Sequence, residues 1–127
     1  MLMKNVISTD KAPAAIGPYS QAIEANGFIF VSGQIPIDPK TNTLSNEPFE
    51  AQVRLVLNNI SEILKAAGST LDNVLKTTVF IKDINNFSAF NDIYSEFFKN
   101  TKPARSLVEV SNLPKGALIE IEVIAKN

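Results

Sequence analysis

The first part of the chain alternates apolar and polar residues in the manner of short β-strands. This pattern predicts strands at residues 5–8, 20–25 and 28–32. The Asn26-Gly27 dipeptide favours a two-residue turn, so the second and third strands are expected to form a hairpin. Prolines and turn residues are frequent in 11–18 and 33–48, which are predicted to be loops.

Two later segments show the three-to-four-residue spacing of amphipathic helices. The first spans residues 49–67, with Pro48 suited to its first turn and Gly68 to the position after its end. Its apolar stripe consists of Phe49, Val53, Val56, Leu57, Ile60, Leu64 and Ala67. The second helix is predicted to follow a cap at Asn85 or Asn86 and to reach Lys99. Its apolar positions are Phe87, Phe90, Ile93, Tyr94, Phe97 and Phe98.

Apolar and β-branched runs predict three more strands, at residues 74–82, 104–110 and 118–125. We expect the last two to pair as a hairpin. Because each helix lies between strands, parallel crossovers are expected beside the hairpins. Two helices cover only one face of such a sheet, so a second copy of the chain is the simplest cover for the other face. A polar, solvated outer face is the alternative.

Composition narrows the possible chemistry. The chain has 127 residues, which fit one domain over 1–127, and it contains no cysteine and no histidine. Disulfides and thiolate chemistry are therefore excluded, and we expect no metal site. A net charge of −1 without a basic run argues against a nucleic-acid partner. We see neither a signal peptide nor an apolar membrane span, so a soluble, cytoplasmic protein is expected.

Arg105 is unusual because it lies in an apolar predicted strand. A guanidinium in such a place needs a matching charge, and its fork of donors fits a carboxylate. Arg105 is therefore a candidate anchor for a substrate carboxylate. The alternative is a structural ion pair with Glu109, Glu120 or Glu122.

Glu120 and Glu122 share one face of the last predicted strand, because side chains alternate along a strand. Two neighbouring carboxylates repel each other, which raises the pKa of one of them and suits it to proton transfer near neutral pH. The alternative is an ordinary half-exposed strand with a polar face. The pattern does not establish whether Arg105 faces either glutamate.

Four further residues are candidate binding groups, each with a plain structural alternative. Asn91 lies within the apolar arc of the second helix and needs a hydrogen-bond partner there. Tyr19 follows a Gly-Pro turn and is placed to close a pocket, or simply to pack. Ser32 and Gly33 end a strand, where glycine lets a ligand approach the backbone or merely allows a turn.

Several collinear segments together resemble the RidA/YjgF family of reactive intermediate deaminases. They are APAAIGPYSQAI (12–23), VSGQIPIDP (31–39), KTTVFIKDINNF (76–87), FNDIYSEFF (90–98), PARSLVEV (103–110) and LPKGALIEIEVIA (113–125). The resemblance implies an α+β, chorismate mutase-like domain with a six-stranded mixed sheet backed by two helices. It also implies a barrel-like homotrimer, with the sheets facing inward and the sites in clefts between subunits.

The same resemblance implies an enzyme that hydrolyses reactive 2-imino acids, such as 2-iminopropionate and 2-iminobutyrate, to 2-keto acids and ammonia. Arg105 is then expected to bind the substrate carboxylate, and Glu120 to direct water and move protons. Backbone groups at Ser32 and Gly33 are expected to hold the substrate, while Tyr19 and Asn91 shape the pocket. No cofactor and no metal are implied.

One position departs from the family pattern. Many members have cysteine after PARS, where this chain has Leu107. The expected mechanism uses no thiol, so activity should survive, with a tighter or drier pocket. Other functions stay open: a non-catalytic 2-keto acid-binding regulator, an endoribonuclease or translation inhibitor, or a purely structural trimer. The ribonuclease reading fits poorly with a slightly negative charge and no histidine.

Overall fold

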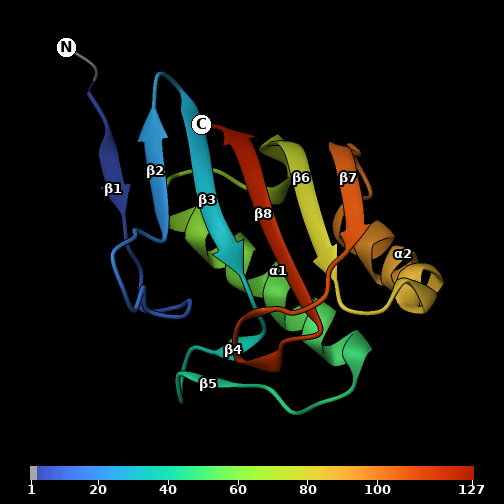
Figure 1. Ribbon diagram of the computed structural model, residues 1–127. Helices are drawn as coiled ribbons and strands as arrows, with labels where there is room; N and C mark the ends of the chain where they lie inside the picture. The colour runs from blue at the N-terminus through green and yellow to red at the C-terminus, as the bar shows by residue number, and fades with distance from the viewer. Residues whose placement is uncertain (1–2) are drawn as a thin grey trace.

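The computed structural model describes residues 3–127, and in it both helices pack on one face of a six-stranded mixed sheet (Figure 1). The sheet strands are β1 (Asn5–Ile7), β2 (Ala22–Ala25), β3 (Phe28–Gln34), β6 (Val74–Ile81), β7 (Ala104–Glu109) and β8 (Ile119–Lys126). The helices are α1 (Phe49–Ala66) and α2 (Phe87–Phe97), with 3-10 turns η1 (Leu71–Asn73), η2 (Ile84–Asn86) and η3 (Pro114–Gly116). The predicted α+β fold is confirmed.

The strand order is β1-β2-β3-β8-β6-β7, and β6 with β7 is the one parallel pair. The expected hairpin of the last two strands is therefore wrong, because β6 lies between them. The crossover through α2 delivers β7 to the outer edge of β6, parallel to it. The chain then returns through η3 and places β8 in the centre of the sheet. There, the alternating apolar residues of β8 are buried against the helices.

The predicted first hairpin is confirmed. Ala25 pairs with Phe28, and the turn residues Asn26 and Gly27 have φ angles of 53° and 82°. Two successive residues with positive φ are what a tight hairpin with right-handed strand twist requires. The predicted loop at 33–48 contains one further small hairpin, formed by β4 (Ile37–Asp38) and β5 (Thr43–Leu44).

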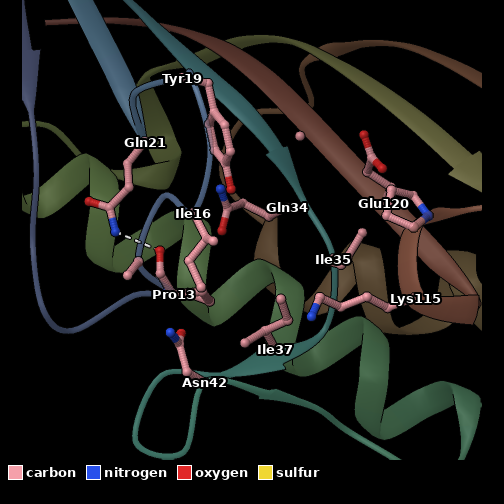
Figure 2. Close-up of a pocket in the computed structure, with 13 residues that line it drawn as sticks. Pro13, Ile16, Tyr19, Gln21, Gln34, Ile35, Ile37, Asn42, Lys115 and Glu120 are labelled. Atoms are coloured by element: carbon pink, nitrogen blue, oxygen red, sulfur yellow. Dashed lines mark hydrogen bonds between the residues drawn. The ribbon is translucent and has the colours of Figure 1, made fainter.

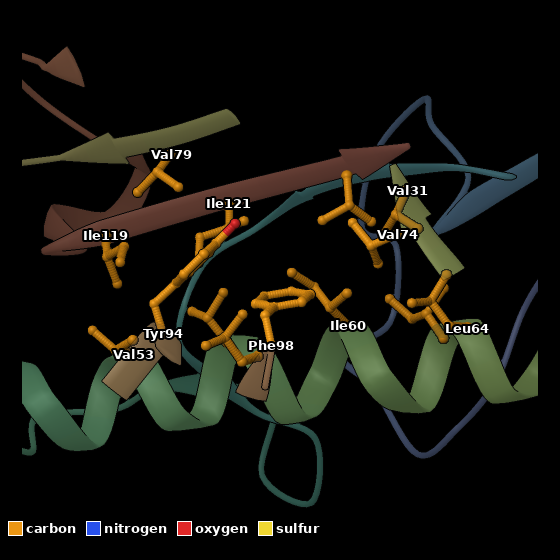
Figure 3. Packing of buried hydrophobic residues seen from close by; sticks show 14 of the residues in the cluster. Val31, Val53, Ile60, Leu64, Val74, Val79, Tyr94, Phe98, Ile119 and Ile121 are labelled. Carbon is orange, nitrogen blue, oxygen red and sulfur yellow. The ribbon is translucent and has the colours of Figure 1, made fainter. Parts of the chain in front are cut away.

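Helix α1 buries its apolar stripe against the sheet, as Figure 3 shows for Val53, Ile60 and Leu64. Its end agrees with the prediction, since Gly68 has a φ angle of 81°. Helix α2 begins after Asn86 as expected, but ends at Phe97 rather than Lys99.

The predicted side-chain cap of α2 is wrong in detail. The Asn86 side chain makes no capping hydrogen bond, and the carboxylate of Asp83 instead accepts from the backbone N–H of Asn85 at 2.9 Å. The cap therefore serves η2, the turn that precedes the helix. An aspartate before a short turn satisfies a free N–H as well as an asparagine at the helix start does.

The sheet face away from the helices carries exposed apolar side chains near its centre and edge. They are Phe28, Phe30, Val108 and Ile124, all of which are at least 36% exposed in the protomer. Neither helix covers this face (Figure 1). Exposed apolar side chains on an uncovered sheet face are typical of an interface. No helix within residues 3–127 is long and apolar enough to cross a membrane.

Candidate active site

Glu120 and Arg105 line two separate cavities that share no residue. The Glu120 cavity has a volume of about 360 Å³ and is lined by Pro13, Ala14, Ile16, Tyr19, Gln21, Gly33, Gln34, Ile35, Ile37, Asn42, Pro114, Lys115 and Glu120. The Arg105 cavity has a volume of about 460 Å³ and is lined by Asn91, Tyr94, Ser95, Phe98, Lys102, Pro103 and Arg105. Both volumes suit a small metabolite.

The carboxyl of Glu120 lies directly against Gly33. The pairing of β3 with β8 shifts register between Val31 and Gln34, so Ser32 and Gly33 form an irregularity beside Glu120. A Cβ atom at position 33 would overlap the Glu120 carboxylate. Glycine at position 33 therefore leaves room for the Glu120 carboxyl, which an added methyl group would displace. This close approach refines the sequence-based argument about ligand access.

The half-buried position of Glu120 alters its acidity. Burial raises the pKa of Glu120 above its usual range, and the negative charge of Glu122 raises it further. The expectation from the two-residue spacing is confirmed in direction, although burial is the larger cause. A carboxyl with a raised pKa in a cavity is suited to accept and return a proton.

Tyr19 lies across the cavity from Glu120, beside Gln34 (Figure 2). Its side chain is half exposed in the protomer. Ser32 does not line the cavity: its N–H donates to the carbonyl of Gln21 at 3.0 Å, and its hydroxyl donates to the carbonyl of Ser20 at 2.6 Å. Both Ser32 donors thus hold the loop that carries Tyr19 against β3.

Gln21 and Lys115 are among the cavity residues that the sequence-based interpretation missed. The buried Gln21 donates to the carbonyl of Pro13 at 2.7 Å and accepts from the N–H of Thr9 at 2.7 Å, so it shapes the loop that forms one wall. Lys115 adopts a left-handed backbone with φ of 59°, and its side chain reaches toward Ile37 (Figure 2). The sequence around Gln21 or Lys115 has no pattern that marks either residue as part of a cavity.

Arg105 is held by one face of α2. Its guanidinium donates to Oδ1 of Asn91 at 2.9 Å. Its Cζ atom lies 5.7, 5.6 and 4.9 Å from the ring centroids of Phe87, Phe90 and Tyr94. Residues at this spacing share one helix face, which is why the apolar stripe of α2 also forms a cation–π cradle.

Within residues 3–127, no carboxylate lies within ion-pair distance of the Arg105 guanidinium. The ion pairs within residues 3–127 are Arg54 with Glu96 and Lys65 with Glu62. The alternative of a structural ion pair between Arg105 and a neighbouring glutamate is therefore wrong for the protomer. A half-buried guanidinium fixed by aromatic rings and one amide is a preorganised site for an anion.

Strand register places the two candidate groups on opposite faces of the sheet. Arg105 is the partner of Thr77, which is buried toward the helices. Glu120 is the partner of Phe80, three residues further along β6 and therefore on the other face. One protomer thus assembles Tyr19, Gly33 and Glu120 in one place and Arg105 with Asn91 in another.

No group of three or more acidic side chains within the described part of the chain is arranged to hold a metal ion. The two cavities instead offer groups for binding and for proton transfer. The Arg105 cavity provides a fixed cation for a carboxylate, and the Glu120 cavity provides a carboxyl that can carry a proton, next to the backbone of a strand.

Comparison with known proteins reveals relatives over nearly the whole chain. Residues 9–127 match the family model described as Endoribonuclease L-PSP. A RutC family protein of Pyrococcus horikoshii is 56% identical over 97% of this chain and 98% of its own length. The human protein named 2-iminobutanoate/2-iminopropanoate deaminase is 49% identical over 98% of this chain and 90% of its own length.

Solved structures agree with these relatives. A Rid family protein, YyfA of Yersinia pestis, has a TM-score of 0.96 and 59% identity, covering 98% of this chain and 100% of that one. The structure of Escherichia coli TdcF with bound serine has a TM-score of 0.92 and 42% identity, covering 97% and 98%.

Fold and sequence therefore define a domain of the Rid class. The chain belongs to the RidA/YjgF family, as the resemblance of its segments predicted. That family includes mammalian proteins named as imine deaminases and others named as endoribonucleases.

Proposed function

We propose that this protein hydrolyses reactive 2-imino acids, including 2-iminopropanoate and 2-iminobutanoate, to 2-keto acids and ammonia. The observation that carries the proposal is Glu120, a half-buried carboxyl with a raised pKa, seated on Gly33 in a cavity of metabolite size. The unneutralised Arg105 supports it, because a 2-imino acid carries a carboxylate. The name of the human relative agrees with this chemistry.

The proposed active site is completed by a second copy of the chain. Arg105 and Glu120 lie on opposite faces of one protomer, so one small molecule contacts both only between subunits. The uncovered apolar sheet face supplies an interface. We propose a homotrimer with three equivalent clefts, each formed by Arg105 and Asn91 of one subunit and Glu120, Tyr19 and Gly33 of the next.

The reaction adds water across the carbon–nitrogen double bond. Glu120 accepts a proton from water as the water oxygen bonds to the imine carbon, which gives a tetrahedral species. Glu120 returns this proton to the nitrogen, which gives an amino alcohol. It then accepts the hydroxyl proton and passes it to the same nitrogen as the carbon–nitrogen bond breaks, so the carbonyl group of a 2-keto acid forms and ammonia leaves. Arg105 holds the carboxylate throughout, so the enzyme mainly positions water and substrate. No residue in this scheme requires a cofactor or a metal.

A coupled assay tests the activity. An amino acid oxidase generates 2-iminopropanoate from alanine while semicarbazide traps the free imine. Wild-type protein should reduce semicarbazone formation, and Arg105→Ala and Glu120→Ala should not. Arg54→Ala is the matched control, because its guanidinium forms an exposed ion pair with Glu96 and neither residue lines a cavity.

Subunit mixing tests the composite site. When Arg105→Ala and Glu120→Ala chains are unfolded together at equal amounts and refolded, about one quarter of the clefts receive both intact groups. Activity near that fraction supports the proposal. A mixture as inactive as its parents, despite exchanged subunits, means that both intact groups must come from the same chain, and this result contradicts the composite cleft.

The same assay separates the other candidate functions. A regulator that binds 2-keto acids without turnover needs Arg105 but not Glu120, so ligand binding without hydrolysis would favour it. The family description as an endoribonuclease favours a test with RNA. Salt-dependent retention of RNA would support that function, although the net charge of −1 speaks against it. A cytoplasmic location accompanies the proposed metabolic role.

A further inference from the structure

A buried hydrogen bond lies directly behind Arg105. The hydroxyls of Tyr94 on α2 and Thr77 on β6 are 2.8 Å apart, and these residues are 7% and 0% exposed. Burial raises the pKa of Tyr94, so the phenol stays protonated. Phenylalanine in place of Tyr94 and valine in place of Thr77 would have nearly the same shape. They would also avoid the cost of burying two hydroxyl groups. Packing alone does not explain the pair.

The Tyr94 ring is fixed from several sides. Its centroid lies 5.1 Å from that of Phe90 and 4.7 Å from that of Phe98, with the rings tilted by 39° and 41°. Of the three rings around Arg105, it lies closest to the guanidinium carbon, at 4.9 Å. Its hydroxyl partner Thr77 is also the residue opposite Arg105 on the neighbouring strand.

We propose that Tyr94, tied to Thr77, is a positioning residue that holds the Arg105 guanidinium in the orientation that receives a substrate carboxylate. The hydrogen bond locks the ring to the strand beside Arg105, and the ring face then fixes the plane of the guanidinium. Asn91 fixes the same group from a second direction. This inference rests on the proposed function, because it needs Arg105 to bind the substrate.

Loss of the ring should weaken binding with little effect on turnover. The carboxylate is held equally in the ground state and the transition state, so KM should rise while kcat stays close to wild type. Removing one stacked ring from a partly desolvated guanidinium should raise the Kd roughly threefold to thirtyfold.

Calorimetric titration with 2-oxobutyrate tests this, alongside KM and kcat from the imine assay. Tyr94→Leu is compared with Phe49→Leu, which truncates an aromatic residue that is also 7% exposed but lines neither cavity. The two variants should lose similar thermal stability, and only Tyr94→Leu should raise the Kd. Arg105→Ala, measured in parallel, tests the proposed function itself.

A second variant separates positioning from folding. In Thr77→Val with Tyr94→Phe both hydroxyls are removed, so neither is left buried without a partner and stability should return close to wild type. The Kd should nevertheless stay raised by about threefold, because the ring is no longer tied to β6.

The outcomes are distinct. A Kd raised in both Tyr94 variants and unchanged in Phe49→Leu supports the positioning role. Equal effects in Tyr94→Leu and Phe49→Leu, or wild-type binding by the double variant, overturn it while leaving the Arg105 anchor intact. Unchanged binding by Arg105→Ala overturns both the anchor and this inference.

Discussion

Gly33→Ala should disable the enzyme through a single added methyl group. The new Cβ would lie 2.9 Å from Cδ and 3.2 Å from Cγ of Glu120, besides overlapping its carboxylate oxygen. Ordinary carbon contacts need about 3.5–4.0 Å, so the carboxyl must move by roughly 1 Å. Gly33 is not among the glycines with positive φ, so alanine causes no backbone strain.

The expected effects of Gly33→Ala on the rate and on stability differ sharply. Displacing a catalytic group by about 1 Å costs on the order of a hundredfold in rate. The loss of stability should be only about 1 kcal/mol, because the half-buried Glu120 side chain can rotate toward solvent. A hundredfold fall in kcat/KM with nearly wild-type stability is therefore the expected result.

Gly27→Ala supplies the control. Its added Cβ meets nothing within 4 Å, but its φ of 82° strains any other residue. It should cost about 1 kcal/mol or more of stability and leave imine hydrolysis unchanged. Both rates come from the semicarbazide assay, and stability from urea denaturation. Wild-type kcat/KM in Gly33→Ala, or an equal loss in Gly27→Ala, would refute the role of the close approach to Glu120.

Four further predictions concern charged residues and Leu107. Because the charge of Glu122 adds to the burial that raises the pKa of Glu120, Glu122→Gln should lower this pKa and move the acidic limb of the pH–rate profile to lower pH. Because the pKa of Glu120 is raised in the folded state, the free energy of unfolding should fall as the pH rises from its unfolded-state pKa to its folded-state pKa. Glu120→Gln should remove this fall, as measured by urea denaturation at several pH values in that range. Leu107→Cys should keep its imine hydrolysis, because no step uses a thiol; a tenfold or larger change, on the order of 1.4 kcal/mol, would contradict this. Arg54→Met breaks an exposed ion pair and should leave the melting temperature nearly unchanged by calorimetry.

Local structure could be predicted wherever it depends on residues that are close together in the sequence. The Asn26-Gly27 turn, the stripe of α1 and its end at Gly68 were predicted because turn chemistry and helical spacing depend on near neighbours. The paired glutamates of β8 were predicted to perturb each other for the same reason. Arg105 stood out because an arginine in an apolar strand is costly without a partner.

The arrangement of the candidate site did not follow in the same way. The pairing of β7 with β8 was predicted wrongly because sequence neighbours usually pair, whereas the crossover through α2 places β6 between them. Phe90 and Tyr94 looked like ordinary core positions, and only their packing shows that they also surround Arg105. The close approach of the Glu120 carboxyl to Gly33 brings together residues that are far apart in the chain.

By itself, the sequence determined the two helices and the six strands of the main sheet, the family and the residue types available for chemistry, since these depend on composition and local spacing. Only the tertiary structure decided which face each strand presents. Strand register fixes that choice, and a shift of one residue would exchange the two faces. The separation of Arg105 from Glu120 within one protomer, and with it the need for a second subunit in the proposed reaction, follows from register alone.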